Sequence, residues 1–307
     1  MSELRLTVSD VSPEGMRLDR YCANHAGAVS RSRLKNGALG VTVNRKPAKL
    51  SRTVKNGDEI ILAWEDPVPE RIEGEDIPLS VLYEDDNVTV IDKAQGMVTH
   101  PAAGNWTGTL VNALMWRWGI ECPGASLRPG IVHRLDKDTS GVIITARNPE
   151  TETFLQERFR TRQTRKVYVA VLQGVPRMAR GDIRTRIARD PKNRKRFTWT
   201  DDESRGKTAH TGYRVIKTYG GYSLVLFRLY TGRTHQLRVH SKYMGCPILG
   251  DPIYGKKDRI FPDSTLMLHA RRLTIALPDS KGVMTFRAPL PDRFKAVIGR
   301  LRDLYRG

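Results

Sequence analysis

The stretch at residues 130–147 most constrains the fold, because it holds a short polar loop between two apolar segments. Its sequence is GIVHRLDKDTSGVIITAR, and the β-branched run at 142–146 predicts a buried strand. The loop before that strand carries two carboxylates, Asp136 and Asp138, among basic side chains. Nearby positive charge keeps a carboxylate ionised, as a nucleophile, a general base or a metal ligand requires. An ordinary turn, in which Asp, Thr and Ser side chains bond their own backbone, explains these residues equally well.

The remaining segments predict strands more often than helices. Alternating or β-branched runs favour strands at 166–172 and on both sides of a turn within 210–230. Apolar residues at helical spacing favour helices after Thr109 and over 151–162. Because strands and helices do not alternate in a βαβ rhythm, we expect an α+β fold with a mixed, mostly antiparallel sheet in the main domain.

Changes of composition along the chain indicate two domains and a linker. Residues 1–65 read as a small unit of one or two helices and short strands, with Leu18 and Cys22 on one helical face. Residues 66–78, DPVPERIEGEDIP, are rich in proline and acidic residues, which is typical of a linker. Residues 79–307 form the larger domain.

The chain is strongly basic, with 52 Lys and Arg against 33 Asp and Glu and a net charge of +19. Residues 158–217 alone hold 18 Lys and Arg against 5 Asp and Glu, so +13 of that charge lies in one segment. Each cation that neutralises a phosphate releases a condensed counterion. A nucleic acid is therefore the expected partner, in preference to a basic surface kept for solubility.

Membrane and extracellular classes are disfavoured. No run approaches the ~18 apolar residues of a membrane span, and no basic amphipathic helix has an aromatic face. The N-terminal segment lacks the apolar core of a signal peptide. The cysteines, Cys22, Cys122 and Cys246, have neither a metal-binding spacing nor the pattern of a disulfide framework. We expect a cytoplasmic protein that does not bind a membrane.

Two basic clusters are candidate RNA contacts. Arg31, Arg33 and Lys35 begin a predicted helix, where free backbone amides and cations together suit phosphate. The second cluster, RDPKNRKRF, contains Arg194 and Lys195 and ends in an aromatic residue, which suits contact with phosphates and bases. An exposed basic surface is the alternative for both clusters.

The segment TGRTHQLRVH at 231–240 carries hydroxyls, cations, an amide and imidazoles, and it is too polar for a plain core segment. His235 and His240 raise the question of zinc, but no further ligands follow at a useful spacing. We therefore expect no metal site.

Several motifs in this chain occur in one order in a known enzyme family. They are HRLDKDTSG, RKVYVAVLQG, RDPKNRKRF, TGRTHQLRVH, GCPILGDPIYG and LHA, together with VIDKAQGMVTHP, in which Ala94 stands where the family usually has proline. On these motifs the chain resembles the RluA-type pseudouridine synthases. The segments SRSRL, VTVN and KNGDEI resemble an alpha-L type RNA-binding module, and that module points to the RluD-like branch, which acts on large-subunit ribosomal RNA.

The resemblance implies a role for each matching residue. Asp136 matches the essential catalytic aspartate. Tyr168, which the residues alone explain as well by core or rim packing, matches the tyrosine that stacks on the target base and is a candidate general base. Arg233 matches the arginine that pairs with the aspartate and holds the flipped nucleotide, and Leu268 falls in the apolar wall of the pocket. Asp138 is then expected to shape the turn.

The implied reaction breaks the bond between ribose and the base nitrogen, rotates the base and rejoins it through carbon 5. No redox change or net hydrolysis occurs, so we expect no cofactor and no metal. Flipping the uridine costs a few kcal/mol, and stacking on Tyr168 offsets ~1–3 kcal/mol of that. We predict RNA contacts at Arg31, Arg33, Lys35, Arg134, Lys166, Arg194, Lys195, His235 and Arg238. The expected substrate is ribosomal RNA, free or in a precursor particle, and the expected state is a monomer.

Two alternatives remain open at this point. A metal-dependent glycosyltransferase would use Asp136 and Asp138 as a DxD metal site. A non-catalytic RNA-binding protein that assists ribosome assembly would account for the charge without any chemistry.

Overall fold

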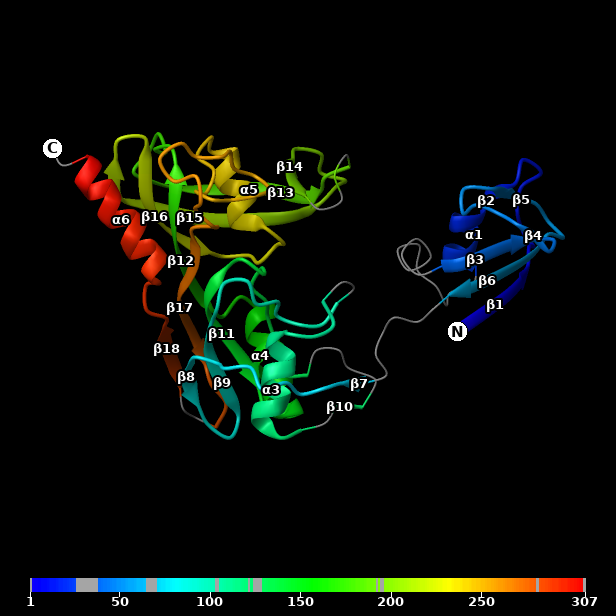
Figure 1. Ribbon diagram of the computed structural model, residues 1–307, viewed down its shortest axis with the longest axis horizontal. Coiled ribbons are helices and arrows are strands. Elements are labelled where there is room, and N and C mark those ends of the chain that lie inside the picture. Colours follow the sequence, from blue (N-terminus) through cyan, green and yellow to red (C-terminus); the bar gives the residue numbers. More distant parts are fainter. Residues whose placement is uncertain are drawn as a thin grey trace. The chain divides into compact units, whose positions relative to one another are not determined.

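The computed structural model (Figure 1) describes residues 2–25, 38–64, 71–102, 105–120, 122–123, 129–191, 193, 196–279 and 282–305. The chain divides into two compact units, Met1–Glu70 and Arg71–Gly307. No helix in these ranges is both long and apolar enough to cross a membrane. Cys22 and Cys246 are free and buried.

The small unit is a four-stranded antiparallel sheet with one described helix packed on it. Its elements are β1 (Ser2–Thr7), β2 (Met16–Arg17), α1 (Leu18–His25), β3 (Ala38–Val43), β4 (Lys46–Pro47), β5 (Thr53–Val54) and β6 (Glu59–Trp64). The strand order is β1-β6-β3-β4, and β2 pairs with β5. Leu18 and Cys22 are fully buried against Ile60 and Leu62 of β6, so the predicted helical face forms the core of this unit. The predicted basic helix with Arg31, Arg33 and Lys35 lies outside the described residues.

The predicted linker is too long at its C-terminal end. Residues from Arg71 onward belong to the larger unit, where β7 (Arg71–Ile72) pairs with β10 (Cys122–Pro123). Ile72 is buried, and the backbone amide of Glu75 donates to the carbonyl of Asn112. The buried Ile72 side chain, the β7–β10 pairing and this hydrogen bond together hold the segment on the larger unit, which composition alone did not reveal.

The larger unit contains four described helices and most of the strands. In chain order its remaining elements are β8 (Val81–Glu84), β9 (Val88–Lys93), α3 (Leu110–Trp118), β11 (Ser140–Ala146), α4 (Pro149–Arg160), β12 (Arg165–Gln173), β13 (Arg180–Arg189), β14 (Phe197–Thr200), β15 (Lys207–Tyr219), β16 (Tyr222–Leu229), α5 (Gln236–Tyr243), β17 (Leu268–Ala276), β18 (Val283–Arg287) and α6 (Asp292–Leu304). The helices predicted after Thr109 and over 151–162 are α3 and α4, capped by Thr109 and Asn148.

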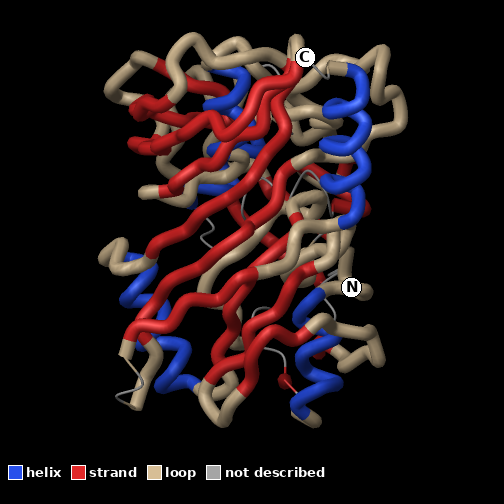
Figure 2. Tube along the Cα trace, turned by 90° about the vertical axis from the view of Figure 1, so that its left-hand side faces the viewer, coloured by secondary structure: helices blue, strands red, loops and turns tan. Residues whose placement is uncertain are grey.

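One sheet organises this unit. Its strand order is β14-β13-β15-β16-β12-β17-β11-β9-β8, and β18 also pairs with β17. Figure 2 shows the long strands, in red, lying side by side. Among the described pairs, only β11 and β17 run parallel, with Ser140 opposite His269 and Gly141 opposite Ala270. The mixed, mostly antiparallel α+β fold expected from the sequence is therefore confirmed.

Both faces of the central strands are buried, which explains the unbroken apolar run at 142–146. In β11, Ile143 packs into one core cluster, whereas Val142 and Ile144 pack into another on the opposite face. The C-terminal helix α6 contributes Phe294 and Leu301 to the first cluster and so covers that face of the sheet (Figure 1).

Candidate active site

The loop that precedes β11 is held by its backbone carbonyls. The Leu135 carbonyl accepts from the Thr99 hydroxyl at 3.0 Å, and the Asp136 carbonyl accepts from the Thr139 amide at 3.0 Å. The next two carbonyls, of Lys137 and Asp138, accept from the Gly96 amide and the Gln95 side chain, both at 2.9 Å. Four successive carbonyls are thus satisfied, and the Asp136 side chain projects from a rigid turn.

A buried lysine lies beneath this loop. Lys93 is fully buried at the end of β9, and its Nζ donates to the carbonyls of Ala94 and Met97 at 2.8 Å and of Lys137 at 3.2 Å. Burial lowers the pKa of Lys93 to about 8, against the opposing effect of the nearby carboxylates of Asp136 and Asp138. A cation that binds three carbonyls ties the end of β9 to the loop. Its signal in the sequence is a lysine that ends an apolar strand, which our sequence analysis did not use.

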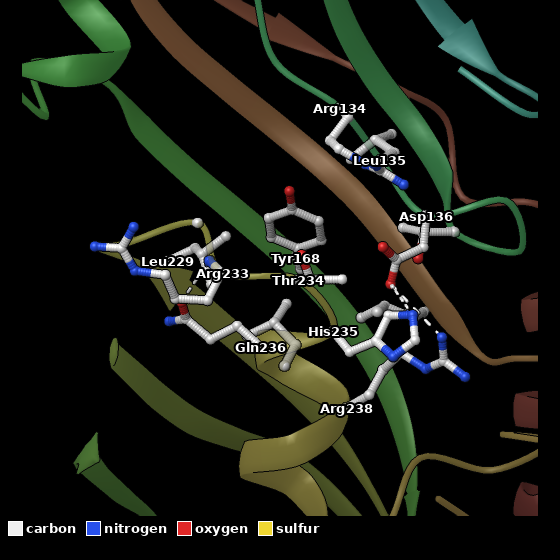
Figure 3. Close-up of a pocket in the computed structure, with 14 residues that line it drawn as sticks. Arg134, Leu135, Asp136, Tyr168, Leu229, Arg233, Thr234, His235, Gln236 and Arg238 are labelled. Atoms are coloured by element: carbon white, nitrogen blue, oxygen red, sulfur yellow. Dashed lines mark hydrogen bonds and ion pairs between the residues drawn. The ribbon is translucent and has the colours of Figure 1, made fainter. Parts of the chain in front are cut away.

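A pocket of about 100 Å³ opens beside Asp136 (Figure 3). It is lined by Arg134, Leu135, Asp136, Thr139, Tyr168, Leu229, Gly232, Arg233, Thr234, His235, Gln236, Leu237, Arg238 and Leu268. Tyr168 comes from β12, Leu268 from β17 and Asp136 from the loop before β11, three neighbouring strands of the sheet. The leucines and the tyrosine ring make apolar walls, and Asp136, His235 and Arg238 lie close together at one end. Such a pocket suits a small planar group that carries polar edges.

Tyr168 reaches the pocket at an irregularity of the sheet. The register between β12 and β17 shifts between Val167 and Val169, so Tyr168 lies at a bulge, a feature that often re-aims a side chain near a site. The residue is only 8% exposed. Burial, and secondarily the charge of Asp136, raise the pKa of the Tyr168 hydroxyl far above its usual range. The hydroxyl is therefore protonated at neutral pH, and the ring is the part that faces a ligand.

The guanidinium of Arg238 and the imidazole of His235 face the Asp136 carboxylate. Its Oδ2 lies 3.6 Å from Nη1 of Arg238 and 3.9 Å from Nε2 of His235 (Figure 3). The guanidinium of Arg238 is held from behind by Asp251, through hydrogen bonds of 2.8 and 2.7 Å. Burial lowers the pKa of the His235 imidazole, an effect that the Asp136 charge opposes. Asp136 thus has one fixed positive charge and one neutral imidazole beside it.

The predicted pairing of Arg233 with Asp136 is wrong for this structure. Arg233 lines the pocket, but its Nε donates to the carbonyl of Thr208 at 2.9 Å. Figure 3 shows its guanidinium pointing away from Asp136, on the other side of Tyr168. The physical reason is that Arg233 precedes α5, whereas Arg238 lies within that helix, on the side that faces the loop of Asp136. The partner of the carboxylate is Arg238, five residues later in the same motif.

The predicted RNA contacts differ in how exposed their side chains are. Arg134 is exposed at the pocket, where it can reach a ligand. Lys166 is partly buried, with Nζ 5.7 Å from the ring centre of Phe159, and burial lowers its pKa to about 8. The Arg238 side chain is only 3% exposed and bonded to Asp251, so it lines the pocket beside Asp136 and does not lie on an exposed RNA-binding surface. His235, at 15% side-chain exposure, lies beside it. Arg194 and Lys195 lie outside the described residues.

The polar segment 231–240 is buried rather than exposed, because its polar groups satisfy one another. The Gln236 amide accepts from the Thr231 hydroxyl at 2.7 Å and donates to the carbonyl of His210 at 3.0 Å. His240 bonds through its two ring nitrogens to the hydroxyls of Thr185 and Thr211, at 3.0 and 2.9 Å. A buried polar network of this kind fixes the helix that carries His235 and Arg238.

Asp138 differs from Asp136 although the two are close in sequence. Its backbone carbonyl accepts from Gln95, but its carboxylate makes no hydrogen bond with any described residue, so the expected side-chain role in the turn is not seen. Within the described ranges, no group of three or more His, Cys, Asp and Glu side chains is arranged to hold a metal ion.

The family model for RNA pseudouridylate synthases matches residues 87–243, just over half of the chain, and this segment holds the loop of Asp136, Tyr168 and α5. The chain belongs to the RNA pseudouridylate synthase family. Enzymes of this family convert uridine to pseudouridine in RNA. The glycosyltransferase and the non-catalytic alternatives have no support among the matches.

Similar proteins cover nearly the full length of the chain. An uncharacterised RNA pseudouridine synthase of Chlorobaculum parvum is 41% identical, with 98% of each chain aligned. The ribosomal large subunit pseudouridine synthase D of Borreliella burgdorferi is 40% identical, over 92% of this chain and 89% of its own length. Among solved structures, human RNA pseudouridylate synthase domain containing 4 is 28% identical with a TM-score of 0.57, and the match covers 73% of this chain and 93% of the human one.

Proposed function

We propose that this RNA pseudouridine synthase acts on large-subunit ribosomal RNA, with Asp136 as its catalytic carboxylate. The observation that carries the catalytic assignment is the geometry of one pocket, in which Asp136 lies between an aromatic ring and the fixed charge of Arg238, 3.6 Å from its Oδ2. The name of the Borreliella burgdorferi relative supports the ribosomal target. A cytoplasmic location is part of the same proposal.

The pocket supports base flipping. A uridine that leaves its stack places its ring against Tyr168, with Leu229 and Leu268 as the remaining apolar walls. Stacking on an aromatic side chain is worth ~1–3 kcal/mol, which offsets much of the cost of unstacking in a loop. The Tyr168 hydroxyl stays protonated and is therefore neutral. The ring can then stack on the base without placing a second anion beside Asp136.

Asp136 is the group placed to act on the ribose or on the base. The guanidinium of Arg238 places a positive charge 3.6 Å from Oδ2 of that carboxylate. Since Arg238 is bound to Asp251, the counter-charge keeps its place while the base turns about and rejoins the ribose. Arg134, exposed at the pocket, is available to the phosphates on either side of the flipped nucleotide.

The small unit adds affinity in this proposal. Residues 1–65 resemble an RNA-binding module and hold the predicted contacts Arg31, Arg33 and Lys35. Deletion of 1–65 is expected to weaken RNA binding or alter site choice, while the remaining chain still forms pseudouridine. An unchanged affinity and site profile would refute this role.

The test of the proposed function maps pseudouridine in total RNA from cells with and without this gene, and from cells that carry Asp136→Asn or Asp138→Asn. The expected result is loss of one or more pseudouridines in large-subunit RNA without the gene and with Asp136→Asn. Asp138→Asn is the matched control and should restore them. Pseudouridine formed by Asp136→Asn would refute the catalytic assignment. Loss confined to another RNA would refute the ribosomal target.

A further inference from the structure

His235 has a strained backbone at the edge of the pocket. Its φ of 56° and ψ of 18° lie in the left-handed region, which few residues other than glycine adopt, although histidine does so more often than most. The residue occupies the N-cap position of α5 but makes no capping hydrogen bond with its side chain. Strain of this kind persists only where surrounding contacts hold it, and it gathers at functional sites. The imidazole is therefore held for a reason other than capping the helix.

The hydroxyl of Tyr254 holds the imidazole from behind. Tyr254 lies in the segment GCPILGDPIYG, 2.9 Å from Nδ1 of His235, and its ring meets the imidazole edge-on. The same hydroxyl accepts a hydrogen bond of 2.8 Å from the backbone amide of Phe197. Tyr254 is buried at 5% exposure, so solvent does not compete for these contacts. Its side chain thus connects the first residue of β14 to the edge of the pocket.

The hydrogen bonds of Tyr254 point to one tautomer of His235. The Phe197 amide can only donate, so the Tyr254 hydroxyl accepts that bond and keeps its own proton for another partner. Among the described residues, the one acceptor within reach of that proton is Nδ1 of His235. Nδ1 is then unprotonated, and the proton of the neutral ring lies on Nε2. That nitrogen faces Oδ2 of Asp136 at 3.9 Å.

We propose that Tyr254 and His235 are positioning residues, through which the first residue of β14 directs an N–H group at the Asp136 carboxylate. This inference rests on the proposed catalytic role of Asp136. The groups that face His235 are Asp136, Arg238, Asp251, Arg134 and Tyr254. Arg238 holds the Asp136 carboxylate by charge, and the Nε2–H of His235 points at the same carboxylate from a second direction. Partners of this indirect kind commonly change activity by about 10- to 100-fold.

The strand that carries Phe197 follows directly on the basic loop of the β13–β14 hairpin. The Phe197 ring meets His235 edge-on at 5.7 Å, and the guanidinium of Arg189 lies over the Phe197 ring at 5.3 Å. Arg196 lies over the Tyr254 ring at 5.6 Å. The cations at the base of this hairpin thus contact the same aromatic residues that hold His235.

The test compares single-turnover kinetics and RNA affinity of the full-length enzyme with those of Tyr254→Phe, His235→Asn and the double variant. Asparagine is chosen at 235 because it tolerates the left-handed backbone. The matched control is Tyr222→Phe, which also removes a tyrosine hydroxyl, one that donates to Asp258 outside the pocket. We expect each single variant to lower the chemical rate about 10-fold with unchanged RNA affinity. The double variant should be no slower than His235→Asn, because the two residues act through one path.

A second measurement uses the wild-type protein, so its result does not depend on whether a variant folds. Side-chain ¹⁵N shifts of His235 in the wild-type protein should report a neutral ring protonated on Nε2. Protonation on Nδ1 would overturn the inference, as would a Tyr254→Phe rate equal to that of Tyr222→Phe, or a loss of RNA affinity in place of rate. If Asp136→Asn remains active, the proposed function fails instead. The two failures are therefore distinguishable.

Discussion

Arg238 and Asp251 form a buried two-point ion pair, with Nε 2.8 Å from Oδ2 and Nη2 2.7 Å from Oδ1. Their side chains are 3% and 0% exposed. Asp251 also accepts the backbone amides of Ile253 and Tyr254 at 2.9 and 3.0 Å. One carboxylate therefore fixes both the counter-charge of Asp136 and the segment that carries Tyr254.

Substitution of Asp251 is expected to destabilise the larger unit. Asp251→Asn leaves the Arg238 guanidinium buried without its partner, a change that costs about 3–5 kcal/mol and lowers the melting temperature by roughly 6–20 °C. Thermal unfolding followed by circular dichroism measures the effect. Asp292→Asn is the control, because its ion pair with Lys295 is exposed and should leave the midpoint unchanged. Equal midpoints for both variants would contradict the assignment.

The two arginines of the TGRTHQLRVH segment should differ in their effects on chemistry. Arg238→Lys loses the two-point contact with Asp251 and leaves the cation free to move away from Asp136. We expect the single-turnover rate to fall by about 10²-fold, as when a fixed charge-stabilising donor is lost. Arg233→Lys should reduce that rate much less, since Arg233 contacts the Thr208 carbonyl. The reverse order would show that Arg233 turns to Asp136 when RNA binds.

Tyr168 should contribute to binding through its ring. Tyr168→Phe keeps the ring and is expected to bind substrate RNA with wild-type affinity, whereas Tyr168→Ala removes a stacking surface worth ~1–3 kcal/mol and should weaken binding about 5- to 150-fold. Filter binding at fixed salt measures the difference, with thermal unfolding as a check that both variants fold. If Phe and Ala weaken binding equally, the hydroxyl rather than the ring is the contact.

Acid should destabilise the larger unit through His240. Burial lowers the pKa of His240 to about 4, whereas an unfolded histidine titrates near ~6.5. Between these pH values the unfolded state binds a proton that the folded state does not bind. The free energy of unfolding therefore falls as pH drops from about 6.5 toward 4, by up to ~1.4 kcal/mol per pH unit. His240→Gln can still bond the two threonine hydroxyls and should flatten this slope. Denaturation at several pH values checks it, and an unchanged slope would mean that other groups set the acid limit.

Much of the fold was accessible from patterns in the sequence, because those patterns are local. The β-branched run of β11, the cap at Thr109, the helical spacing over 151–162 and the turn at Gly220 each predict an element within about two residues of its observed bounds. The extent of the linker was not accessible in this way, since burial of Ile72, the β7–β10 pairing and the hydrogen bond between Glu75 and Asn112 hold the segment on the larger unit. The composition of a segment is an average over its residues and does not show such contacts.

The site was predictable in part, for the same reason. The motif around Asp136 is contiguous, and Tyr168 and Leu268 could be assigned by resemblance. The choice between Arg233 and Arg238 was not open to sequence reasoning, because both are in one motif and only the helix α5 decides which faces the loop. Lys93, Asp251 and Tyr254 reach the site through contacts with residues at least 13 positions away in the chain, in addition to local bonds with two carbonyls near Lys93 and two amides near Asp251. No local pattern encodes those contacts.

The parallel pairing of β17 with β11 also sets the order in which the enzyme can become active. β17 lies between β12 and β11 in the sheet but follows both in the chain by about a hundred residues or more, and it brings Leu268 into the pocket. During synthesis the two older strands have no partner on their shared side until that late strand arrives. A growing chain therefore exposes the loop of Asp136 without a finished pocket around it until β17, one of the last strands to be made, adds the wall that Leu268 forms.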